Sequence, residues 1–296
     1  MMADSVAAAP AQLKTGGEYG SRVLAFSPDG KTLAGTIYVP NQPQVTVGLW
    51  DLKTGKLKTT LETHPDVRAL AFSPDSKTLA TGKGGRWTGQ IKLWDVKTGK
   101  LKRNVASGYS RRDSEGGRIG PYLGIGPVFA LAFSPNGKSI AMGTQRDGEL
   151  SSGGEALILN VATGKVTRTL KFPSHPVSSL AFSPNGRTVA VACQDGRIRL
   201  CSVRTGKMLR VTQKHSSLIP AVGFTPDGKS IVSVTDDQKV SFWSAQTGRL
   251  TRKLTRRLMN VGGLYKSAPE GFAISKDART IAACGDEPVI RFASIK

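Results

Sequence analysis

Cysteine, acidic side chains and long apolar runs are all scarce in this sequence. No apolar run approaches the roughly 20 residues that a membrane-spanning helix needs. Residues 1–12 have neither the basic start nor the apolar stretch of a signal peptide. The three cysteines follow no Cys-x-x-Cys pattern and the three histidines are scattered, so we expect no zinc site, no other metal and no cofactor. An odd number of unpatterned cysteines is typical of reduced thiols and favours a cytoplasmic protein.

Two of the cysteines, Cys193 and Cys201, lie in neighbouring predicted strands. If Asp195 and Gly196 form a two-residue hairpin turn, Cys193 faces residue 198 and Cys201 faces residue 190. The two thiols are then offset along the ladder, so we expect no disulfide between them.

Positive charge is abundant. The 42 Lys and Arg residues face only 21 Asp and Glu residues, which gives a formal net charge of +21. Such an excess keeps a protein in solution. It also favours an acidic partner, such as nucleic acid, an anionic lipid surface or an acidic protein. Composition alone does not choose among these.

One short phrase, Phe-Ser-Pro-Asp-Gly, recurs along the chain with small changes. Its copies begin at Phe26, Phe72, Phe133, Phe182, Phe224 and, in an eroded form, Ile274. Successive copies begin 42 to 61 residues apart. Self-similarity at this period indicates an array of one supersecondary unit.

Residues 66–104 show what one copy contains. Turns around Pro74 and Gly99 interrupt short segments rich in β-branched and apolar residues. The predicted strands are Val67–Phe72, Thr78–Thr81, Ile91–Asp95 and the more polar Leu101–Arg103. Four short antiparallel strands, with the last one polar, describe one blade of a β-propeller.

The Trp-Asp pairs at Trp50-Asp51 and Trp94-Asp95, with the Thr-Gly-Lys turn that follows each pair, resemble the WD40 repeat family. The pair weakens in the other copies, to Trp243-Ser244, Leu159-Asn160, Cys201-Ser202 and Phe292-Ala293. The resemblance covers about residues 20–296 and implies a ring of similar blades.

We therefore predict an all-β, six-bladed WD40-type β-propeller of four-stranded antiparallel blades. Seven blades, the commoner number in the family, is the alternative. The blades begin near residues 22, 67, 128, 177, 220 and 271. The sixth copy lacks a fourth strand of its own, and an open ring would expose a sheet edge. We expect residues 11–15 to close the ring, with 1–10 as an N-terminal tail and 11–296 as a single propeller domain.

The fifth copy matches the family best. Its polar residues fall where WD40 blades carry a structural hydrogen-bond tetrad: His215, Ser233, Asp237 and Trp243. A Ser-His-Asp hydrolase uses similar residue types, but the repeat accounts for them here, and a motif bound to the fold seldom carries chemistry by itself. His64 and His175 stand in the second and fourth copies without the whole set.

The turns of a propeller lie on two rims. Turns between strands one and two, and between strands three and four, form the bottom rim by WD40 convention. Here they are short, and each carries a Lys or Arg, as exposed turns often do. The long insertions all fall on the top rim, at residues 37–44, 82–90, 104–126, 145–155 and 255–270.

These insertions contain Arg and aromatic side chains, the types enriched in binding hot spots. We predict a partner-binding surface on the top rim, with the alternative that the aromatic side chains fold back onto the barrel mouth. The candidate residues are Tyr38, Arg86, Trp87, Tyr109, Arg111, Arg112, Arg118, Tyr122, Arg146, Arg256, Arg257 and Tyr265.

The sequence favours a non-enzymatic interaction scaffold that binds an acidic or extended segment of another protein or domain. Nucleic-acid binding is the alternative, because Arg-aromatic loops could neutralise phosphates and stack bases, although the basic residues are spread over both rims. A propeller enzyme is the third hypothesis. Its candidate carboxylates have no acid–base or metal spacing: Asp147, Glu149, Glu155, Asp286 and Glu287.

Overall fold

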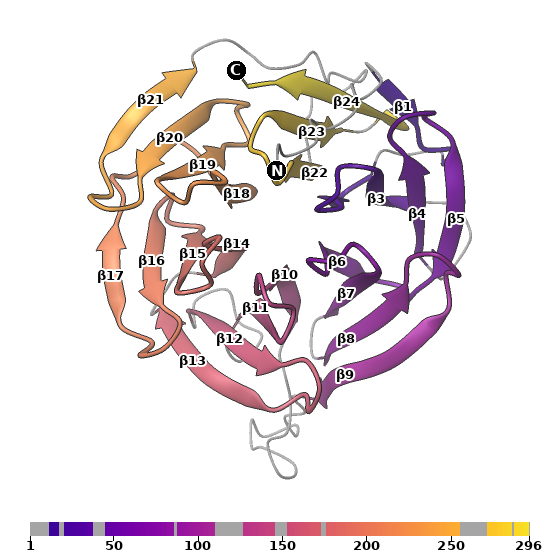
Figure 1. Cartoon of the computed structure of the whole chain (residues 1–296), viewed down its shortest axis with the longest axis horizontal. Helices are drawn as coiled ribbons and strands as arrows, with labels where there is room; N and C mark the ends of the chain where they lie inside the picture. The colour runs from indigo at the N-terminus through magenta and orange to yellow at the C-terminus, as the bar shows by residue number, and fades with distance from the viewer. Residues whose placement is uncertain are drawn as a thin grey trace, which may run out of the picture.

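The chain folds into six four-stranded antiparallel sheets arranged in a ring, as a computed structural model shows (Figure 1). The structure describes residues 12–17, 21–37, 45–85, 88–109, 127–145, 153–172, 176–254, 271–285 and 287–295. Five sheets are consecutive in the chain, and the sixth has the order β22-β23-β24-β1. We number these sheets blades 1 to 6 in chain order. The predicted six-bladed propeller is confirmed, and the seven-bladed alternative is wrong.

The described residues form strands and turns, and they contain no helix long and apolar enough to cross a membrane. The strands of blades 1 to 3 are β2 (Leu24–Phe26), β3 (Thr32–Ile37), β4 (Thr46–Asp51), β5 (Leu57–Glu62), β6 (Val67–Phe72), β7 (Thr78–Gly85), β8 (Thr88–Asp95), β9 (Leu101–Tyr109), β10 (Val128–Phe133), β11 (Ser139–Gln145), β12 (Gly154–Asn160) and β13 (Val166–Phe172). Those of blades 4 to 6 are β14 (Val177–Phe182), β15 (Thr188–Cys193), β16 (Ile198–Ser202), β17 (Met208–Val211), β18 (Ala221–Phe224), β19 (Ser230–Val234), β20 (Val240–Ser244), β21 (Leu250–Leu254), β22 (Gly271–Ile274), β23 (Thr280–Cys284), β24 (Val289–Ser294) and β1 (Gln12–Lys14).

The recurring Ser-Pro-Asp-Gly phrase forms the turn between the first two strands of a blade. In blade 1 the Asp29 carboxylate accepts hydrogen bonds from Ser27 Oγ at 2.6 Å and from the Lys31 amide at 3.0 Å. Ser27 Oγ in turn accepts the Thr32 amide at 2.8 Å. Gly30 has a φ of 69°, which side chains rarely allow. The phrase is therefore a self-capping turn, which explains its repetition.

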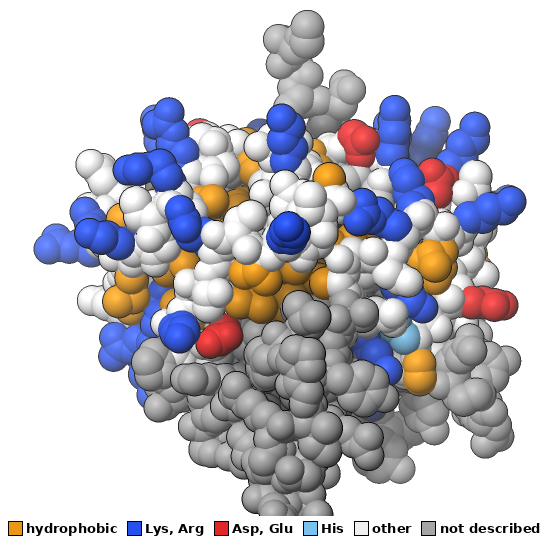
Figure 2. Space-filling model, turned by 90° about the horizontal axis from the view of Figure 1, so that it is seen from below, with side chains coloured by type: hydrophobic (Ala, Val, Ile, Leu, Met, Phe, Trp, Pro, Cys, Tyr) orange, Lys and Arg blue, Asp and Glu red, His pale blue; other side chains and the backbone are white. Residues whose placement is uncertain are grey.

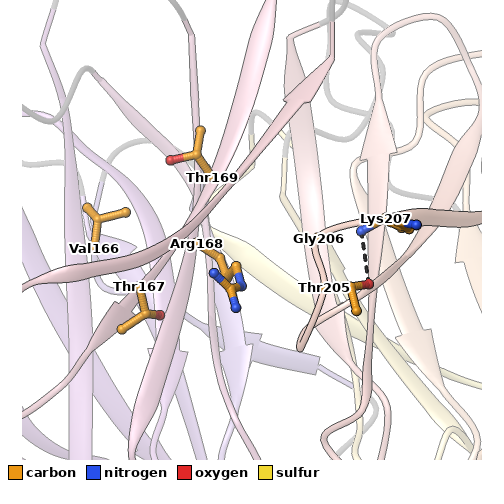
Figure 3. Close-up of a pocket in the computed structure, with 7 residues that line it drawn as sticks. All are labelled: Val166, Thr167, Arg168, Thr169, Thr205, Gly206 and Lys207. Atoms are coloured by element: carbon orange, nitrogen blue, oxygen red, sulfur yellow. Dashed lines mark hydrogen bonds between the residues drawn. The ribbon is translucent and has the colours of Figure 1, made fainter.

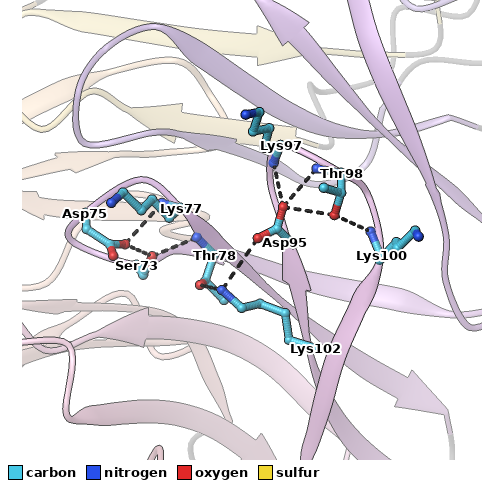
Figure 4. Close-up of polar contacts among 9 residues, drawn as sticks. All are labelled: Ser73, Asp75, Lys77, Thr78, Asp95, Lys97, Thr98, Lys100 and Lys102. Atoms are coloured by element: carbon cyan, nitrogen blue, oxygen red, sulfur yellow. Dashed lines mark hydrogen bonds and ion pairs between the residues drawn. The ribbon is translucent and has the colours of Figure 1, made fainter.

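The turn between strands three and four is capped by the residue that follows the Trp position. Asp95 Oδ1 accepts hydrogen bonds from the Lys97 and Thr98 amides at 3.1 and 2.8 Å and from Thr98 Oγ1 at 3.0 Å (Figure 4). The bonds from Thr98 lower the pKa of the Asp95 carboxyl, and Lys102 Nζ lies 3.7 Å from Asp95 Oδ2. In blades 3 to 5 the turn is capped instead by Asn160, Ser202 and Ser244. The turn needs an acceptor here, and a negative charge is optional.

The N-terminal segment closes the ring. Strand β1 pairs with β24 in the register Gln12↔Arg291, Leu13↔Ile290 and Lys14↔Val289. Leu13 is only 3% exposed, and it packs in one cluster with residues of blades 1 and 6, including Trp50 and Ile290. The predicted closing strand is confirmed. It leaves blade 6 with the same four strands as the others.

Arginine side chains on the outer strands join neighbouring blades. Each donates a hydrogen bond to the carbonyl that precedes the Thr-Gly turn of the next blade. The pairs are Arg103 Nη1 to Ala162 O at 2.9 Å, Arg168 Nε to Arg204 O at 3.0 Å and Arg210 Nε to Gln246 O at 2.9 Å. These bonds add directional contacts to the apolar packing between the sheets.

The core lies between adjacent sheets, and the innermost strands surround a central cavity of about 1240 Å³. Between blades 2 and 3, for example, Ile91 and Leu93 pack with Ile140 and Met142 in one buried cluster. This arrangement explains why the inner strands are largely buried while outer strands such as β13 and β17 are largely exposed.

The hairpin that contains Cys193 and Cys201 differs from its prediction by one residue. Cys201 faces Val189, and the Cys193 amide donates to the Arg197 carbonyl at 3.1 Å. The loop therefore has three residues and ends on Gly196 at a φ of 76°, because a turn that closes with a left-handed residue adds one position to the loop. Cys193, Cys201 and Cys284 are buried and form no disulfide, and burial raises the pKa of Cys193 to about 12.

Candidate interaction surfaces

Three of the four expected tetrad residues form a buried hydrogen-bond chain in blade 5. His215 Nδ1 donates to the Gly196 carbonyl at 2.8 Å, so the neutral ring accepts at Nε2 from Ser233 Oγ, also at 2.8 Å. Ser233 Oγ accepts from Trp243 Nε1 at 2.9 Å. Burial lowers the pKa of His215, which keeps the ring neutral. The chain fixes the loop before β18 to strands β19 and β20.

Asp237 makes its own contacts beside this chain. Its carboxylate accepts hydrogen bonds from Thr235 Oγ1 and from Lys239 Nζ, the latter at 2.5 Å. Its negative charge also raises the pKa of His215, against the larger effect of burial. Asp237 therefore acts on His215 through charge, and its hydrogen bonds hold the turn between β19 and β20.

Blade 2 contains a related chain that sequence reasoning missed. Trp94 Nε1 donates to Thr81 Oγ1 at 3.0 Å, and His64 Nε2 lies 3.5 Å from the same oxygen. His64 Nδ1 is buried without a hydrogen-bond partner, and burial lowers the pKa of His64 to about 4. Thr81 supplies the hydroxyl that Ser233 supplies in blade 5. The remaining histidine, His175, lies outside the described residues.

Most of the expected partner-binding residues lie outside the part of the chain that the structure describes. These are Tyr38, Arg86, Trp87, Arg111, Arg112, Arg118, Tyr122, Arg146, Arg256, Arg257 and Tyr265. Tyr109 is the last residue of β9, where its backbone pairs with Thr88. Thr88 in turn pairs with Gly85 across the β7–β8 hairpin. The backbone of Tyr109 therefore lies beside the two ends of the hairpin that leads to residues 86 and 87.

Comparison with known families identifies the repeats. A model described as WD domain, G-beta repeat matches residues 55–95 and 206–244. These segments run through strands β5 to β8 and β17 to β20, and they include both buried Trp networks. The chain belongs to the WD40-repeat β-propeller family. A model of the anaphase-promoting complex subunit 4 WD40 domain is also similar, over residues 166–224. A search of curated proteins gave no match.

WD40 propellers typically act as scaffolds that bind other proteins, and their repeat domains are generally not catalytic. Of the five carboxylates considered for chemistry, Asp147, Glu149 and Asp286 lie outside the described residues. Glu287 forms an ion pair with Arg291 at 2.6 Å, and Glu155 lies within β12 opposite Thr144 and Lys171. Within the described ranges, no group of three or more His, Cys, Asp or Glu side chains is arranged to hold a metal ion.

The surface of this WD40 propeller is dominated by basic side chains. Figure 2 looks at the edge of the disc and shows Lys and Arg spread over the described surface, with few Asp and Glu among them. Exposed aliphatic residues recur at the first position of the outer strands: Leu57, Leu101, Val166, Met208 and Leu250. Each directly follows the Lys or Arg of a bottom turn. The edge of the disc therefore combines positive charge with apolar contacts.

Proposed function

We propose that this WD40 propeller is a non-enzymatic scaffold that binds an acidic or extended segment of another protein on its top rim. Arg86, Trp87 and Tyr109 stand at the centre of the proposed surface. The propeller supplies a rigid frame, and the loops between its strands supply specificity.

The observation that carries this proposal is the length of three strands in blade 2. Strands β7 and β8 have eight residues each and β9 has nine, whereas β15 and β16 have six and five. The β7–β8 ladder is paired as far as Gly85↔Thr88, and the β8–β9 ladder as far as Thr88↔Tyr109. Gly85 and Thr88, the described residues on either side of positions 86 and 87, thus belong to a three-stranded, hydrogen-bonded support. A site on such a support loses little conformational entropy on binding.

The charge of the chain supports an acidic partner. A net charge of +21 raises the local concentration of anionic segments and speeds their association. Arg and Trp bring a planar donor and a large apolar area to a contact, and both are common in energetic hot spots.

The test is a pull-down with the immobilised full chain, with mass spectrometry to identify bound proteins and a binding assay with each purified candidate. Arg86→Ala combined with Trp87→Ala should abolish capture of the partner. Lys53→Ala combined with Lys56→Ala, on the bottom rim of blade 1, is the matched control and should leave capture intact. Unchanged capture by the Arg86/Trp87 variant would show that the surface lies elsewhere.

A further inference from the structure

The bottom turns of blades 3 and 4 carry basic side chains and no carboxylate. Residues 134–139, 160–166, 183–188 and 202–208 form these turns, and their cations are Lys138, Lys165, Arg187, Arg204 and Lys207. The equivalent turns of blades 1 and 2, residues 27–32, 51–57, 73–78 and 95–101, contain six Lys and four Asp residues. Five cations without an anion give a formal charge of +5 on blades 3 and 4, and six cations with four anions give +2 on blades 1 and 2.

The fold does not require this difference in charge. Asn136 Oδ1 accepts hydrogen bonds from Ser134 Oγ at 2.7 Å and from the Lys138 amide at 3.0 Å. Asp75 accepts the equivalent pair in blade 2 at 2.5 and 3.1 Å. Asn and Asp therefore cap the turn in the same way, and the choice between them changes only the charge of the surface.

A groove between the same two blades adjoins these turns (Figure 3). It has a volume of about 440 Å³ and is lined by residues 166–169 of β13 and residues 205–207 of the turn before β17. Val166 at its wall is 47% exposed, and Met208, the next residue after the lining, is 58% exposed. Arg168 Nε donates to the Arg204 carbonyl, which holds its guanidinium between the two blades. The apolar side chains of Val166 and Met208 and the cationic side chain of Arg168 therefore lie close enough together to contact the same ligand.

The junction between blades 3 and 4 is also more open than its neighbour. A methyl group on Gly164, at the junction of blades 2 and 3, would lie 2.1 Å from the Val105 carbonyl oxygen. A methyl group on Gly206, at the equivalent position of blade 4, would find its nearest atom at 3.5 Å, the Cδ2 of Leu170. The backbone of the preceding outer strand thus stands further away at Gly206, where the nearest neighbour is the Leu170 side chain.

We propose that the four bottom turns and this groove, together the blade 3–4 patch, dock an acidic segment of another protein that carries an aliphatic or aromatic anchor. The carboxylates of the segment contact the five turn cations, and the anchor enters the groove beside Val166 and Met208. Long-range charge attraction brings the segment to the patch, and burial of the anchor fixes its register.

Two features favour a protein segment over nucleic acid or a bilayer. The four turns and the groove lining contain no aromatic residue, whereas single-stranded nucleic acid is usually held by bases stacked on aromatic side chains. The groove between the two blades is lined by one apolar side chain, Val166, among polar and cationic residues, which suits a single anchoring side chain better than a lipid surface. The patch lies on the rim opposite the paired end of the β7–β8 ladder at Gly85 and Thr88, so it is independent of the function proposed above.

The proposal can be tested by removing the charge difference between blades 3 and 4 and blades 1 and 2. Asn136→Asp, Asn160→Asp, Asn185→Asp and Ser202→Asp together place acidic residues at the cap positions that hold Asp in blades 1 and 2. Ser244→Asp makes the same single change as Ser202→Asp, but in blade 5 and outside the patch, so these two single variants form the matched pair. The probe is a fluorescein-labelled peptide of eight to twelve residues, rich in Glu with one central Leu, read by fluorescence anisotropy at about 50 mM salt so that screening is weak. A peptide with Gly in place of Leu tests the anchor.

We expect the four-Asp variant to bind the Leu peptide roughly tenfold or more weakly than the unchanged chain. Ser202→Asp alone should bind it more weakly than its control Ser244→Asp, which should stay within about twofold of the unchanged chain, because screened charge effects fall off over about a Debye length. The Gly peptide should bind the unchanged chain several-fold more weakly than the Leu peptide. If the four-Asp chain does not fold, Arg204→Ala with Lys207→Ala keeps the backbone contacts and should show the same loss. Equal binding by patch and control variants overturns the proposal, as does equal binding of the two peptides. Binding of an oligonucleotide or of phosphatidylserine vesicles, without binding of the Leu peptide, overturns it as well.

Discussion

The Ser233 hydroxyl is the junction of the buried network in blade 5, and its removal tests how much that network stabilises the fold. The oxygen contacts His215 Nε2 at 2.8 Å and Trp243 Nε1 at 2.9 Å, and Ser233 is fully buried. Ser233→Ala leaves both ring nitrogens without a partner in an environment from which water is excluded. Each unpaired buried polar group costs about 1–3 kcal/mol, so for two such groups we expect a loss of about 2–6 kcal/mol in the free energy of unfolding.

Blade 2 provides an internal comparison. Thr81→Val removes the equivalent hydroxyl without a change in side-chain shape. There only the Trp94 contact, at 3.0 Å, is short, since His64 Nε2 lies at 3.5 Å and His64 Nδ1 already lacks a partner. We expect about 1–2 kcal/mol from this change, because one good hydrogen bond is lost instead of two. Ser233→Thr keeps a hydroxyl of the type that blade 2 uses, and it should retain most of the stability.

The assay combines calorimetry with local hydrogen exchange. Differential scanning calorimetry gives the melting temperature, for which we expect a drop of at least about 4 °C in Ser233→Ala, at about 2–4 °C per kcal/mol in a domain of somewhat smaller size. Hydrogen exchange of the β18 to β20 amides shows whether the loss is confined to blade 5, as expected of a repeat fold with nearest-neighbour contacts. A smaller loss in Ser233→Ala than in Thr81→Val, or no loss of protection in β18 to β20, would refute the argument.

Three further changes probe the ring, its junctions and its histidines. Leu13→Asp should open the ring, because Leu13 is only 3% exposed in the closing strand and a charge cannot be buried there. Leu13→Ala should keep the ring closed and lower the free energy of unfolding by about 2–5 kcal/mol. Limited proteolysis should therefore cut Leu13→Asp faster than Leu13→Ala. Arg103→Ala should lower the melting temperature by about 2–4 °C through loss of an exposed, charge-assisted bond of about 1 kcal/mol, and Arg103→Lys should not fully restore it. Burial holds the pKa of His64 at about 4, below its ordinary value of 6.5, so the unfolded chain binds more protons between these values and stability falls as the pH drops from 6.5 toward 4. Melting curves of His64→Leu over this range should show a smaller fall, and an equal fall would contradict the assignment.

The architecture was predictable because residues close together in the sequence specify the turns of each repeat. Pro28 and Gly30 specify a turn wherever the phrase occurs, and the missing fourth strand of the last copy required a segment such as residues 11–15 to pair with it. The family positions within one blade also indicate His215, Ser233 and Trp243 as a connected set, although the predicted set includes Asp237, whose hydrogen bonds go to Thr235 and Lys239.

Contacts between blades and at loops were not predictable in the same way. Arg103 reaches Ala162 across 59 residues, and no pattern around Arg103 marks it as different from other basic residues of the outer strands. The predicted register of the Cys193 hairpin differs from the observed one by one residue, because the sequence around Gly196 is compatible with both a two-residue and a three-residue loop. The role of Thr81 is not evident from the sequence, because blade 2 has threonine where blade 5 has serine. Only the hydrogen bond from Trp94 shows that Thr81 is equivalent to Ser233.

The cap positions of the bottom turns separate what the fold requires from what it leaves open. Asp51, Asp95, Asn160, Ser202 and Ser244 all accept the same amide of the turn, so any short side chain with an acceptor satisfies the architecture. Charge at these positions costs the fold little, because the carboxylates are partly exposed and the nearest ion pairs, at 3.7 to 3.9 Å, are of the weak surface kind. A run of neutral caps in two adjacent blades, beside an open groove, is therefore a property of the surface and not of the fold. For that reason the differences among repeats, more than their similarities, indicate where a partner binds.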